Sequence, residues 1–335
     1  MTDSILIIAE AGVNHNGDLE LARQLVNEAS RANADIVKFQ TFTAENLVTP
    51  NASKATYQKL NDDATENQLQ MLKRLELDRE AHQQLFDHCI DKKIEFLSTG
   101  FDFESLELLS RLGQVRFKIP SGEITNLPYL RQVGRYGRPI IMSTGMATLK
   151  EVEAALTAVE VAGTARDKLT LLHCTTAYPA PAEETNLRAM QTMADTFGVN
   201  IGYSDHTLGT EVAIAAAALG ATVIEKHITL DRNLPGPDHK ASLETTEFGH
   251  MVRAIRRIEA ALGDGTKQPA RSEKDNILIA RRSIVAAMPI SKGETFTEIN
   301  ITTKRPASGL SPMLWDEIVG QPSPRKFDMD EPIEL

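Results

Sequence analysis

The sequence predicts an α/β fold, a (β/α)8 TIM barrel followed by a small C-terminal domain of mostly β and irregular structure. The length of 335 residues exceeds the roughly 250 residues of such a barrel by enough for one small module. Short β-branched runs alternate with amphipathic segments through the first 265 residues, as expected of parallel strands with crossover helices. From Gly263 to Asn276, Gly, Pro and charged residues replace that alternation. We therefore expect a barrel over 1–265, a linker over 266–279 and a second domain over 280–335.

Eight short β-branched runs are candidate strands, which is the number that closes a barrel. In chain order they are Ile5–Ala9, Ile36–Phe39, Ile94–Ser98, Arg116–Ile119, Ile140–Ser143, Leu169–His173, Asn200–Tyr203 and Val223–Glu225.

Apolar residues recur at helical spacing between these strands. The clearest helical segments are Leu19–Ala32, Asp78–Lys92, Glu151–Ala162 and the alanine-rich Glu211–Leu219. An open doubly wound sheet is the structural alternative. It would normally carry a Gly-rich phosphate loop after an early strand, and no such loop follows the first strand here.

Composition and charge exclude several function classes. Hydrophobic residues make up 41% and charged residues 24%, as in soluble globular proteins. Lys plus Arg is 36 and Asp plus Glu is 46, so the formal charge of −10 argues against a nucleic-acid partner. No apolar run approaches the ~20 residues that span a bilayer, and the N-terminus lacks a basic start, so we expect no membrane partner and no signal peptide. Cys89 and Cys174 have no metal-type spacing, which favours two reduced thiols in a cytoplasmic protein.

All eight candidate strands end in polar residues, and in a barrel the carboxyl ends of the strands face the active site. In strand order these residues are Glu10; Lys38 and Gln40; Ser98 and Thr99; Lys118, Ser121 and Glu123; Ser143 and Thr144; His173, Thr175 and Tyr178; Ser204, Asp205 and His206; and Glu225, Lys226 and His227, with Asp238 and His239 in the loop beyond.

Lys38 and Lys118 would repel each other in one cavity unless an anion lay between them. With serine hydroxyls at the neighbouring strand ends, they suit a phosphate or a carboxylate. Alternatively, the lysines pair with Glu10 and Glu123 as internal ion pairs. Both arrangements can hold, since the carboxylates would keep the empty site neutral.

His206 and His227 come from adjacent candidate strands, so their imidazoles can converge on a divalent cation. Two histidine ligands leave positions open for water and substrate, as a catalytic metal requires.

Six motifs in register, EAGVNHNGD, VKFQT, KIPSGE, STGM, YSDHT and EKH, resemble the sialic acid synthase family. The C-terminal stretch ARRSIVAAMPISKGETFTEINITTKRP looks like the antifreeze-like (SAF) domain of those enzymes. The resemblance implies a domain-swapped homodimer that condenses phosphoenolpyruvate with an N-acetylmannosamine-type sugar and releases phosphate. It also implies a divalent metal, Mn²⁺ or Mg²⁺. Two departures, Gly100 in Ser-Thr-Gly-Phe and Ala307 in Arg-Pro-Ala, bear on sugar specificity.

The resemblance assigns a role to each matching residue. By resemblance, the metal ligands are His206 and His227; the phosphoenolpyruvate contacts are Lys38, Gln40, Lys118, Ser121, Ser143 and Ser204; the glutamate beside the reacting carbons is Glu123; the sugar contacts are Glu10, Asn61, Tyr178 and Asp238; and the partner subunit's antifreeze-like domain supplies the equivalent of Arg305. Among these, the expected catalytic residues are Glu123, Glu10, Lys38 and Lys118.

The resulting prediction is an N-acetylneuraminate synthase, with a legionaminic acid synthase acting on 2,4-diacetamido-2,4,6-trideoxymannose as the alternative. More distant alternatives are a condensing enzyme that uses a phosphorylated sugar, and a Schiff-base aldolase with Lys118 or Lys226 as nucleophile. A non-enzymatic ice- or carbohydrate-binding protein would leave the polar strand ends unexplained.

Overall fold

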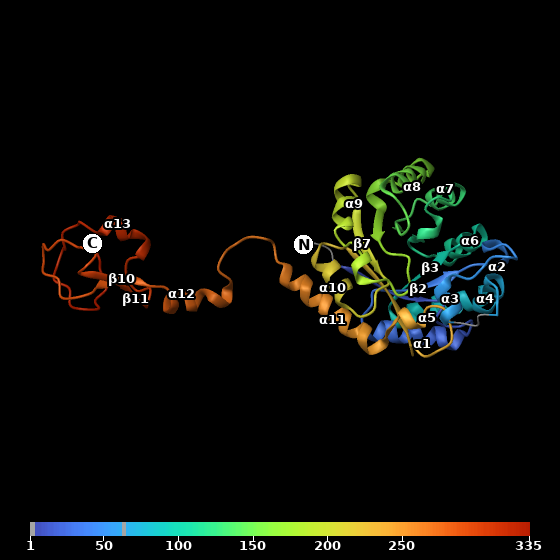
Figure 1. Cartoon of the computed structure of the whole chain (residues 1–335), viewed down its shortest axis with the longest axis horizontal. Coiled ribbons are helices and arrows are strands. Elements are labelled where there is room, and N and C mark those ends of the chain that lie inside the picture. Colours follow the sequence, from blue (N-terminus) through green and yellow to red (C-terminus); the bar gives the residue numbers. More distant parts are fainter. Residues whose placement is uncertain (1–3, 62–64) are drawn as a thin grey trace. The chain divides into compact units, whose positions relative to one another are not determined.

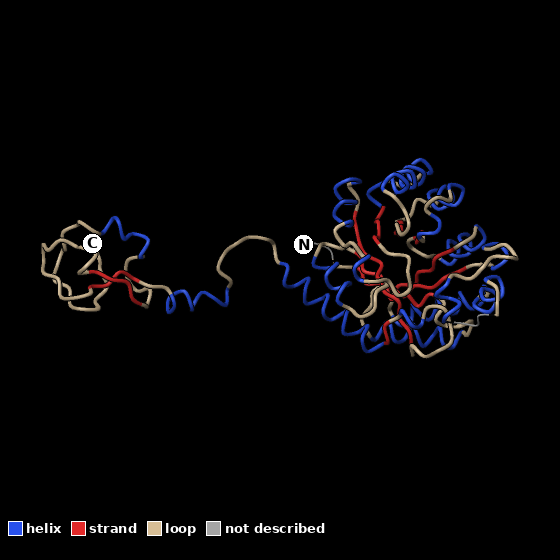
Figure 2. The backbone as a smooth tube through the Cα atoms, in the orientation of Figure 1, coloured by secondary structure: helices blue, strands red, loops and turns tan. Residues whose placement is uncertain are grey.

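The computed structural model describes residues 4–61 and 65–335, and it divides the chain into two compact units, Met1–Gly263 and Asp264–Leu335. In the first unit, strands form an inner ring that helices surround (Figures 1 and 2). The strands are β1 Leu6–Gly12, β2 Ile36–Thr41, β3 Glu95–Gly100, β4 Phe117–Ile119, β5 Ile140–Ser143, β6 Leu169–His173, β7 Asn200–Asp205, β8 Val223–Thr229 and the short β9 Leu243–Glu244.

The helices of this unit follow the strands in alternation. They are α1 Leu19–Arg31, α2 Ala44–Leu47, α3 Thr56–Asn61, α4 Gln68–Leu75, α5 Arg79–Lys92, α6 Phe103–Leu112, α7 Leu127–Arg135, α8 Leu149–Ala162, α9 Ala189–Phe197, α10 Glu211–Ala218 and α11 Thr245–Leu262. Side-chain caps set several of the starts: the carboxylate of Asp18 accepts from the first turn of α1, and that of Asp78 accepts from α5.

Parallel pairing confirms the predicted barrel. The hydrogen-bonded order is β3-β2-β1-β8-β7-β6-β5-β4, so the ring is nearly closed and its seam lies between β3 and β4. Side chains bridge the seam. Gln114 accepts from the Ser98 N–H at 2.7 Å and donates to the Ser98 carbonyl at 3.1 Å. Arg116 donates to both carboxylate oxygens of Glu95, at 2.7 and 3.0 Å.

Strands β1, β2, β7 and β8 extend further at their carboxyl ends than the sequence predicts, and this difference places the site. The predicted strand over Val223–Glu225 extends to Thr229 in β8, and the first strand continues through Glu10 to Gly12. Side chains alternate along a strand, so a residue two positions beyond an interior apolar residue also points into the barrel. Ile8, Ile36 and Val223 belong to an apolar cluster with Leu97, Ile141 and Leu172. The charged residues therefore form the next interior layer above that cluster.

An insertion follows β2, where α2, α3 and α4 precede α5. The sequence analysis did not predict it. Asn67 begins α4 with a capping box to Gln70. Apolar side chains of α4 form a separate cluster with residues of the β1 and β2 loops, namely Val13, Phe42, Ala44, Met71, Leu72 and Leu75.

The second unit contains α12 Lys274–Ala280, the antiparallel strands β10 Ser283–Ala286 and β11 Ile301–Lys304, and α13 Trp315–Ile318. Its core contains Ile284, Phe296 and Phe327, with five further buried apolar residues. Much of the rest is irregular, as predicted. Helix α12 begins at Lys274, within the segment expected as a linker.

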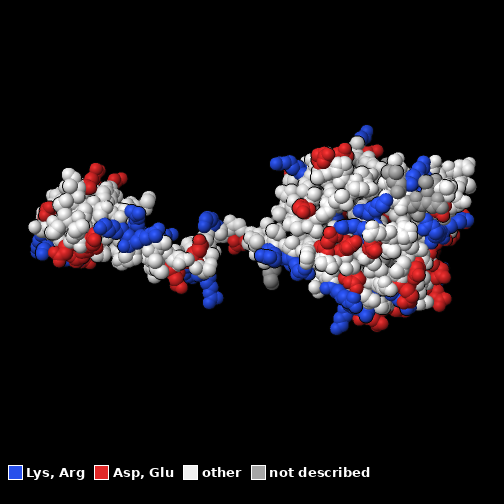
Figure 3. All heavy atoms as spheres, turned by 60° about the horizontal axis from the view of Figure 1, so that its bottom comes forward, with Lys and Arg blue, Asp and Glu red and all other residues white. Residues whose placement is uncertain are grey.

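Acidic and basic side chains are interspersed over the face shown in Figure 3. Both cysteines are buried and free. None of the helices in the described part of the chain has the length and apolar character needed to cross a bilayer.

Because the seam lacks strand pairing, we predict that Gln114→Leu lowers the free energy of unfolding of the barrel by about 2–6 kcal/mol. The change leaves the buried N–H and C=O of Ser98 without partners, and each orphaned group costs about 1–3 kcal/mol. Denaturant titration followed by circular dichroism measures the effect. Gln191→Leu, the same change at an exposed position of α9, should stay within about 0.5 kcal/mol of wild type. Equal stability of the two variants would contradict the role of Gln114.

Candidate active site

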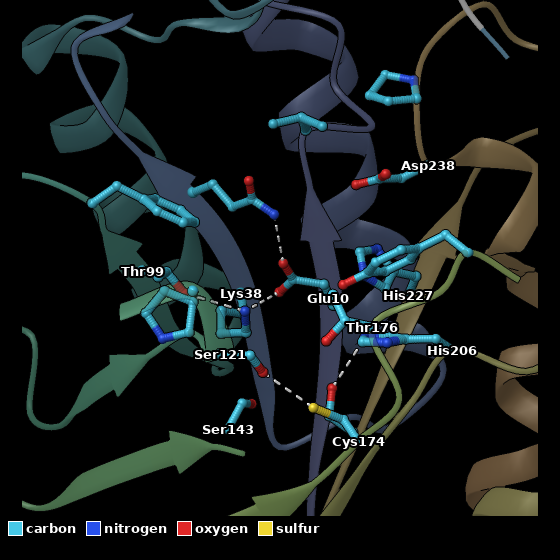
Figure 4. Close-up of a pocket in the computed structure, with 18 of the residues that line it drawn as sticks. Glu10, Lys38, Thr99, Ser121, Ser143, Cys174, Thr176, His206, His227 and Asp238 are labelled. Atoms are coloured by element: carbon cyan, nitrogen blue, oxygen red, sulfur yellow. Dashed lines mark hydrogen bonds and ion pairs between the residues drawn. The ribbon is translucent and has the colours of Figure 1, made fainter. Parts of the chain in front are cut away.

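A cavity of about 290 Å³ lies at the carboxyl ends of the barrel strands (Figure 4). Most of the site residues predicted from the sequence line it: Glu10, Lys38, Gln40, Lys118, Ser121, Ser143, Tyr178, Ser204, His206, His227 and Asp238. In Figure 4, Ser121, Ser143 and Cys174 lie on one side of Glu10, and Asp238 lies on the opposite side of Glu10.

Four buried charges form the floor of the cavity. Lys38 Nζ lies 2.6 Å from Glu10 Oε2 and 3.6 Å from Glu225 Oε2. Lys118 Nζ lies 3.6 Å from the other oxygen of Glu225. All four side chains are almost completely buried, and their formal charges cancel. Glu225 thus holds the two lysines together, in the role that the sequence analysis gave to Glu123.

The four charged groups of the floor have pKa values that are shifted in different directions. Burial alone would raise the pKa of Glu225, but Lys118, Lys38 and a hydrogen bond from Ser204 together lower it to about 2. The pKa of Glu10 is raised, because burial and the charge of Glu225 outweigh the attraction of Lys38. Attraction to Glu10 and Glu225 raises the pKa of Lys38 despite its burial, whereas burial lowers that of Lys118. Glu225 is therefore the carboxylate most firmly held ionised.

Hydroxyl groups continue the floor toward β4 and β5. Lys118 Nζ donates to Ser143 Oγ at 2.6 Å, and the Gly145 N–H donates to Ser121 Oγ at 3.0 Å. A β carbon at Gly145 would lie 2.9 Å from Ser121 Oγ and 3.0 Å from Cys174 Sγ, so this close approach requires glycine. Lysines, hydroxyls and a backbone amide together make a site suited to an anion.

Glycine also makes room for Glu10 at the end of β1. The pairing of β1 with β2 shifts register between Glu10 and Gly12, and Gly12 has a φ of +54°. A β carbon there would lie 3.2 Å from Glu10 Oε1 and 3.3 Å from Gln40 Nε2. Gln40 Nε2 donates to the same oxygen of Glu10 at 3.3 Å.

The two predicted metal ligands lie side by side. The ring centroids of His206 and His227 are 5.7 Å apart. His206 Nδ1 lies 2.7 Å from the Thr175 carbonyl, which leaves Nε2 of that ring turned toward the site. His227 Nδ1 is buried and has no hydrogen-bond partner among the residues that the structure describes. Burial lowers the pKa of both rings, so they are held neutral, the form that binds metals.

Aromatic rings and a carboxyl group form the mouth of the cavity. The ring centroid of Tyr178 lies 4.2 Å from that of His206 and 5.1 Å from that of Tyr57. Burial, together with the charge of Glu10, raises the pKa of Asp238 to about 7. Asp238 can therefore gain or lose a proton near neutral pH.

Three predicted site residues do not line the cavity. Glu123 is half-buried on the turn after β4, and its Oε2 accepts from Asn126 Nδ2 at 2.6 Å. Asn61 Nδ2 donates to the Pro237 carbonyl at 3.1 Å, next to Asp238. Arg305 is exposed in the second unit, after β11.

The sequence analysis assigned no role to Glu225, Thr99, Cys174 or Thr176, all of which line the cavity. For Glu225 and Thr99 a sequence signal was present, because both are polar residues at the ends of candidate strands. Lys226, a nucleophile in the aldolase alternative, is absent from the lining. Its Nζ donates to Asp205 at 2.8 Å, so of the two nucleophiles named for the aldolase alternative, Lys118 is the one that lines the cavity.

Comparison with known proteins gives two matches that together cover most of the chain. Residues 25–267 match the NeuB family and residues 281–334 match the SAF domain. The chain belongs to the NeuB family. It is an enzyme of the sugar-acid synthase type, and the resemblance seen in the sequence is confirmed.

Several similar relatives are bacterial sugar-acid synthases. The chain is 53% identical over 326 residues to the N,N'-diacetyllegionaminic acid synthase of Campylobacter jejuni, covering 97% of this chain and 98% of that one. It is 48% identical to the synthase of the same name from Legionella pneumophila, covering 94% and 89%. The solved N-acetylneuraminic acid synthetase of Leptospira borgpetersenii, in complex with citrate, matches with a TM-score of 0.72 at 33% identity, covering 82% of this chain and 90% of that one.

The raised pKa of Asp238 predicts a pH-dependent stability difference. An ordinary aspartate has a pKa near 3.9, so the folded state binds the Asp238 proton more tightly than the unfolded state. That contribution to stability is complete below about pH 4 and is lost as the pH rises through about 7. The Tm of Asp238→Asn minus the Tm of wild type should therefore be larger at pH 8 than at pH 5, by about 2 °C or more. A Tm difference that does not change between these pH values would contradict the shifted pKa.

Proposed function

We propose that this protein condenses phosphoenolpyruvate with 2,4-diacetamido-2,4,6-trideoxymannose and water, giving a legionaminic acid and phosphate. The observation that carries this choice is the 53% identity to the Campylobacter N,N'-diacetyllegionaminic acid synthase over nearly the full length of both chains. From the sequence alone, N-acetylneuraminate synthesis ranked first. The comparisons favour the alternative.

The floor of the cavity supports the phosphoenolpyruvate half of the reaction. Lys38, Lys118 and the hydroxyls of Ser121, Ser143 and Ser204 can hold the phosphate and carboxylate groups. Carbon 3 then attacks the aldehyde carbon of the open-chain sugar. Water adds at carbon 2, and the C–O bond to phosphate breaks.

The histidine pair supports a divalent metal, Mn²⁺ or Mg²⁺. The unpartnered Nδ1 of His227 and Nε2 of His206, whose one contact is a 3.3 Å hydrogen bond with Ser204 Oγ among the described residues, fit such an ion as two neutral nitrogen donors. Among the described residues, no group of three or more His, Cys, Asp or Glu residues is arranged to bind a metal, so water and substrate would complete the shell. When bound, the ion supplies Lewis-acid polarisation of the aldehyde oxygen.

Proton transfer falls to the carboxyl groups around the sugar. Asp238, with its pKa of about 7, suits proton exchange with an oxygen of the sugar, while Glu10 and Tyr178 orient the chain of hydroxyls. Glu123 is proposed to stabilise the positive charge that develops at carbon 2. To do so, its side chain must leave Asn126 and turn toward the cavity, which its neighbour Gly122 already lines.

The proposed active unit is a domain-swapped homodimer, in which the partner's Arg305 contacts the acetamido group of the sugar. Arg305 is exposed, so it is available to such a contact.

The substrate assignment is tested by phosphate release from phosphoenolpyruvate with each sugar in turn. We expect kcat/KM for 2,4-diacetamido-2,4,6-trideoxymannose to exceed that for N-acetylmannosamine by at least about tenfold, since an engaged acetamido group is a large specificity element. A higher value for N-acetylmannosamine would return the assignment to N-acetylneuraminate. Borohydride trapping of substrate on Lys118, without phosphate release, would instead identify an aldolase.

Removal of metal should abolish turnover. Protein treated with excess chelator is expected to be inactive, and Mn²⁺ should restore activity to wild type but not to His206→Gln, because a carboxamide is a poorer ligand than imidazole. Circular dichroism controls for folding. Full activity in excess chelator would contradict the metal proposal.

Mixing two inactive variants tests the shared site. Glu123→Ala and Arg305→Ala should each lose at least about a hundredfold in kcat/KM. After subunit exchange, half of the dimers are mixed and each contains one intact site, so about a quarter of wild-type activity should return. The control is either variant exchanged with itself. No recovery, with exchange verified by mass spectrometry, would contradict a site shared between subunits.

A further inference from the structure

The cavity has an apolar side in addition to its charged floor. Val13, Met71, Leu72, Leu75 and Phe101 line that side, and three of these residues belong to α4. We call this set the apolar wall. None of its side chains carries a nitrogen or oxygen, whereas the floor is made almost entirely of charged groups and hydroxyls.

The apolar wall is formed without a ligand. Met71 and Leu75 are each about 1% exposed, and they pack against Phe42 and Ala44 behind the wall. The capping box at Asn67 fixes the start of α4. Packing on one face and capping at one end give the wall a defined shape, so it can select among ligands rather than adapt to each.

The insertion that carries the wall is tied across the mouth of the barrel. The hydrogen bond from Asn61 to the Pro237 carbonyl joins α3 to the loop that carries Asp238. The wall and Asp238 line the same cavity, so one ligand can contact both.

The direction of the sugar follows from the reaction. Its aldehyde carbon must meet phosphoenolpyruvate at the floor, between the lysines and the histidines. Carbon 6 is the atom of the open chain furthest from the aldehyde, so it lies toward the mouth. Resting on the proposed function, we infer that the apolar wall binds the methyl group at carbon 6 and selects 6-deoxy sugars over sugars with a 6-hydroxyl.

Solvation gives the reason for this selectivity. A methyl group against the wall leaves water and makes dispersion contacts. A hydroxyl in the same place gives up its hydrogen bonds to water and finds no partner on the wall. Apolar pockets discriminate against an added hydroxyl by up to about a hundredfold, and that sets the upper limit here.

The test compares N-acetylmannosamine with its 6-deoxy counterpart, which differ by one oxygen. Wild-type enzyme with bound metal and saturating phosphoenolpyruvate should favour the 6-deoxy sugar by about 10- to 100-fold in kcat/KM. Leu72→Gln places an amide on the wall and should reduce that preference by about tenfold. Leu72→Met keeps the wall apolar and should leave the preference unchanged.

Leu69→Gln is the matched control. It makes the same change three residues away on α4, at a side chain that packs on the cluster but does not line the cavity. It should keep the wild-type preference. If Leu72→Gln does not fold, Phe101→Tyr adds a hydroxyl to the wall from outside α4 and should act in the same direction.

Two results would overturn the inference: equal use of the two sugars by wild type, or an unchanged preference in a folded Leu72→Gln and in Phe101→Tyr. These outcomes are separate from those for the proposed function. A 6-deoxy preference in an enzyme that rejects the 4-acetamido sugar would support the wall and overturn the legionaminic assignment. If no sugar releases phosphate, the ratio of the Kd values of the two sugars, measured by calorimetry with and without the Leu72 change, decides the question of the wall.

Discussion

The structure of the site depends on the buried charge cluster in which Glu225 bridges Lys38 and Lys118. An unpaired charge at this depth would cost several kcal/mol, so each lysine requires a carboxylate nearby. Three different strands supply these groups, and they meet only when the barrel is almost closed. Ring closure and charge pairing therefore support each other. The side chains of Gln114 and Arg116 bridge the seam between β3 and β4, where strand pairing is absent.

The ion pairs of the floor also set the charge of the empty site. With two lysines and two glutamates the floor is neutral when empty, so an arriving anion adds negative charge. Glu225, with a pKa of about 2, stays ionised and keeps the lysines charged. Glu10 and Asp238 have raised pKa values and can bind protons more easily. Glu225 therefore stays ionised, whereas Glu10 and Asp238 can take up and release protons. The surroundings of each carboxyl group, rather than its side-chain type, cause this difference in pKa.

Local signals in the sequence predicted much of this fold. The starts and ends of α1 and α5 were predicted to within about one residue, because apolar residues recur there at helical spacing. The ends of β1 and β8 were predicted too early, since a charge inside a buried strand is normally disfavoured and only the distant partners of Glu10 and Glu225 make it stable. The partner of Lys118 was misassigned for the same reason. Glu123 is near it in sequence, but its turn directs the side chain to Asn126. The insertion over α2–α4 carries no alternating pattern from which its position over the cavity follows.

Net charge and family membership both describe the enzyme at too coarse a level to identify its sugar. The charge of −10 belongs to the whole chain, while the floor of the cavity is neutral and is lined by lysines. The motifs that resemble the family contribute that floor, where we propose that the carbon–carbon bond forms. A sugar-acid synthase can therefore keep its floor and change its sugar only through residues that meet the distal carbons. In this chain those residues lie largely on α4, in an insertion outside the βα repeat, so substrate choice can vary without disturbing the buried charges.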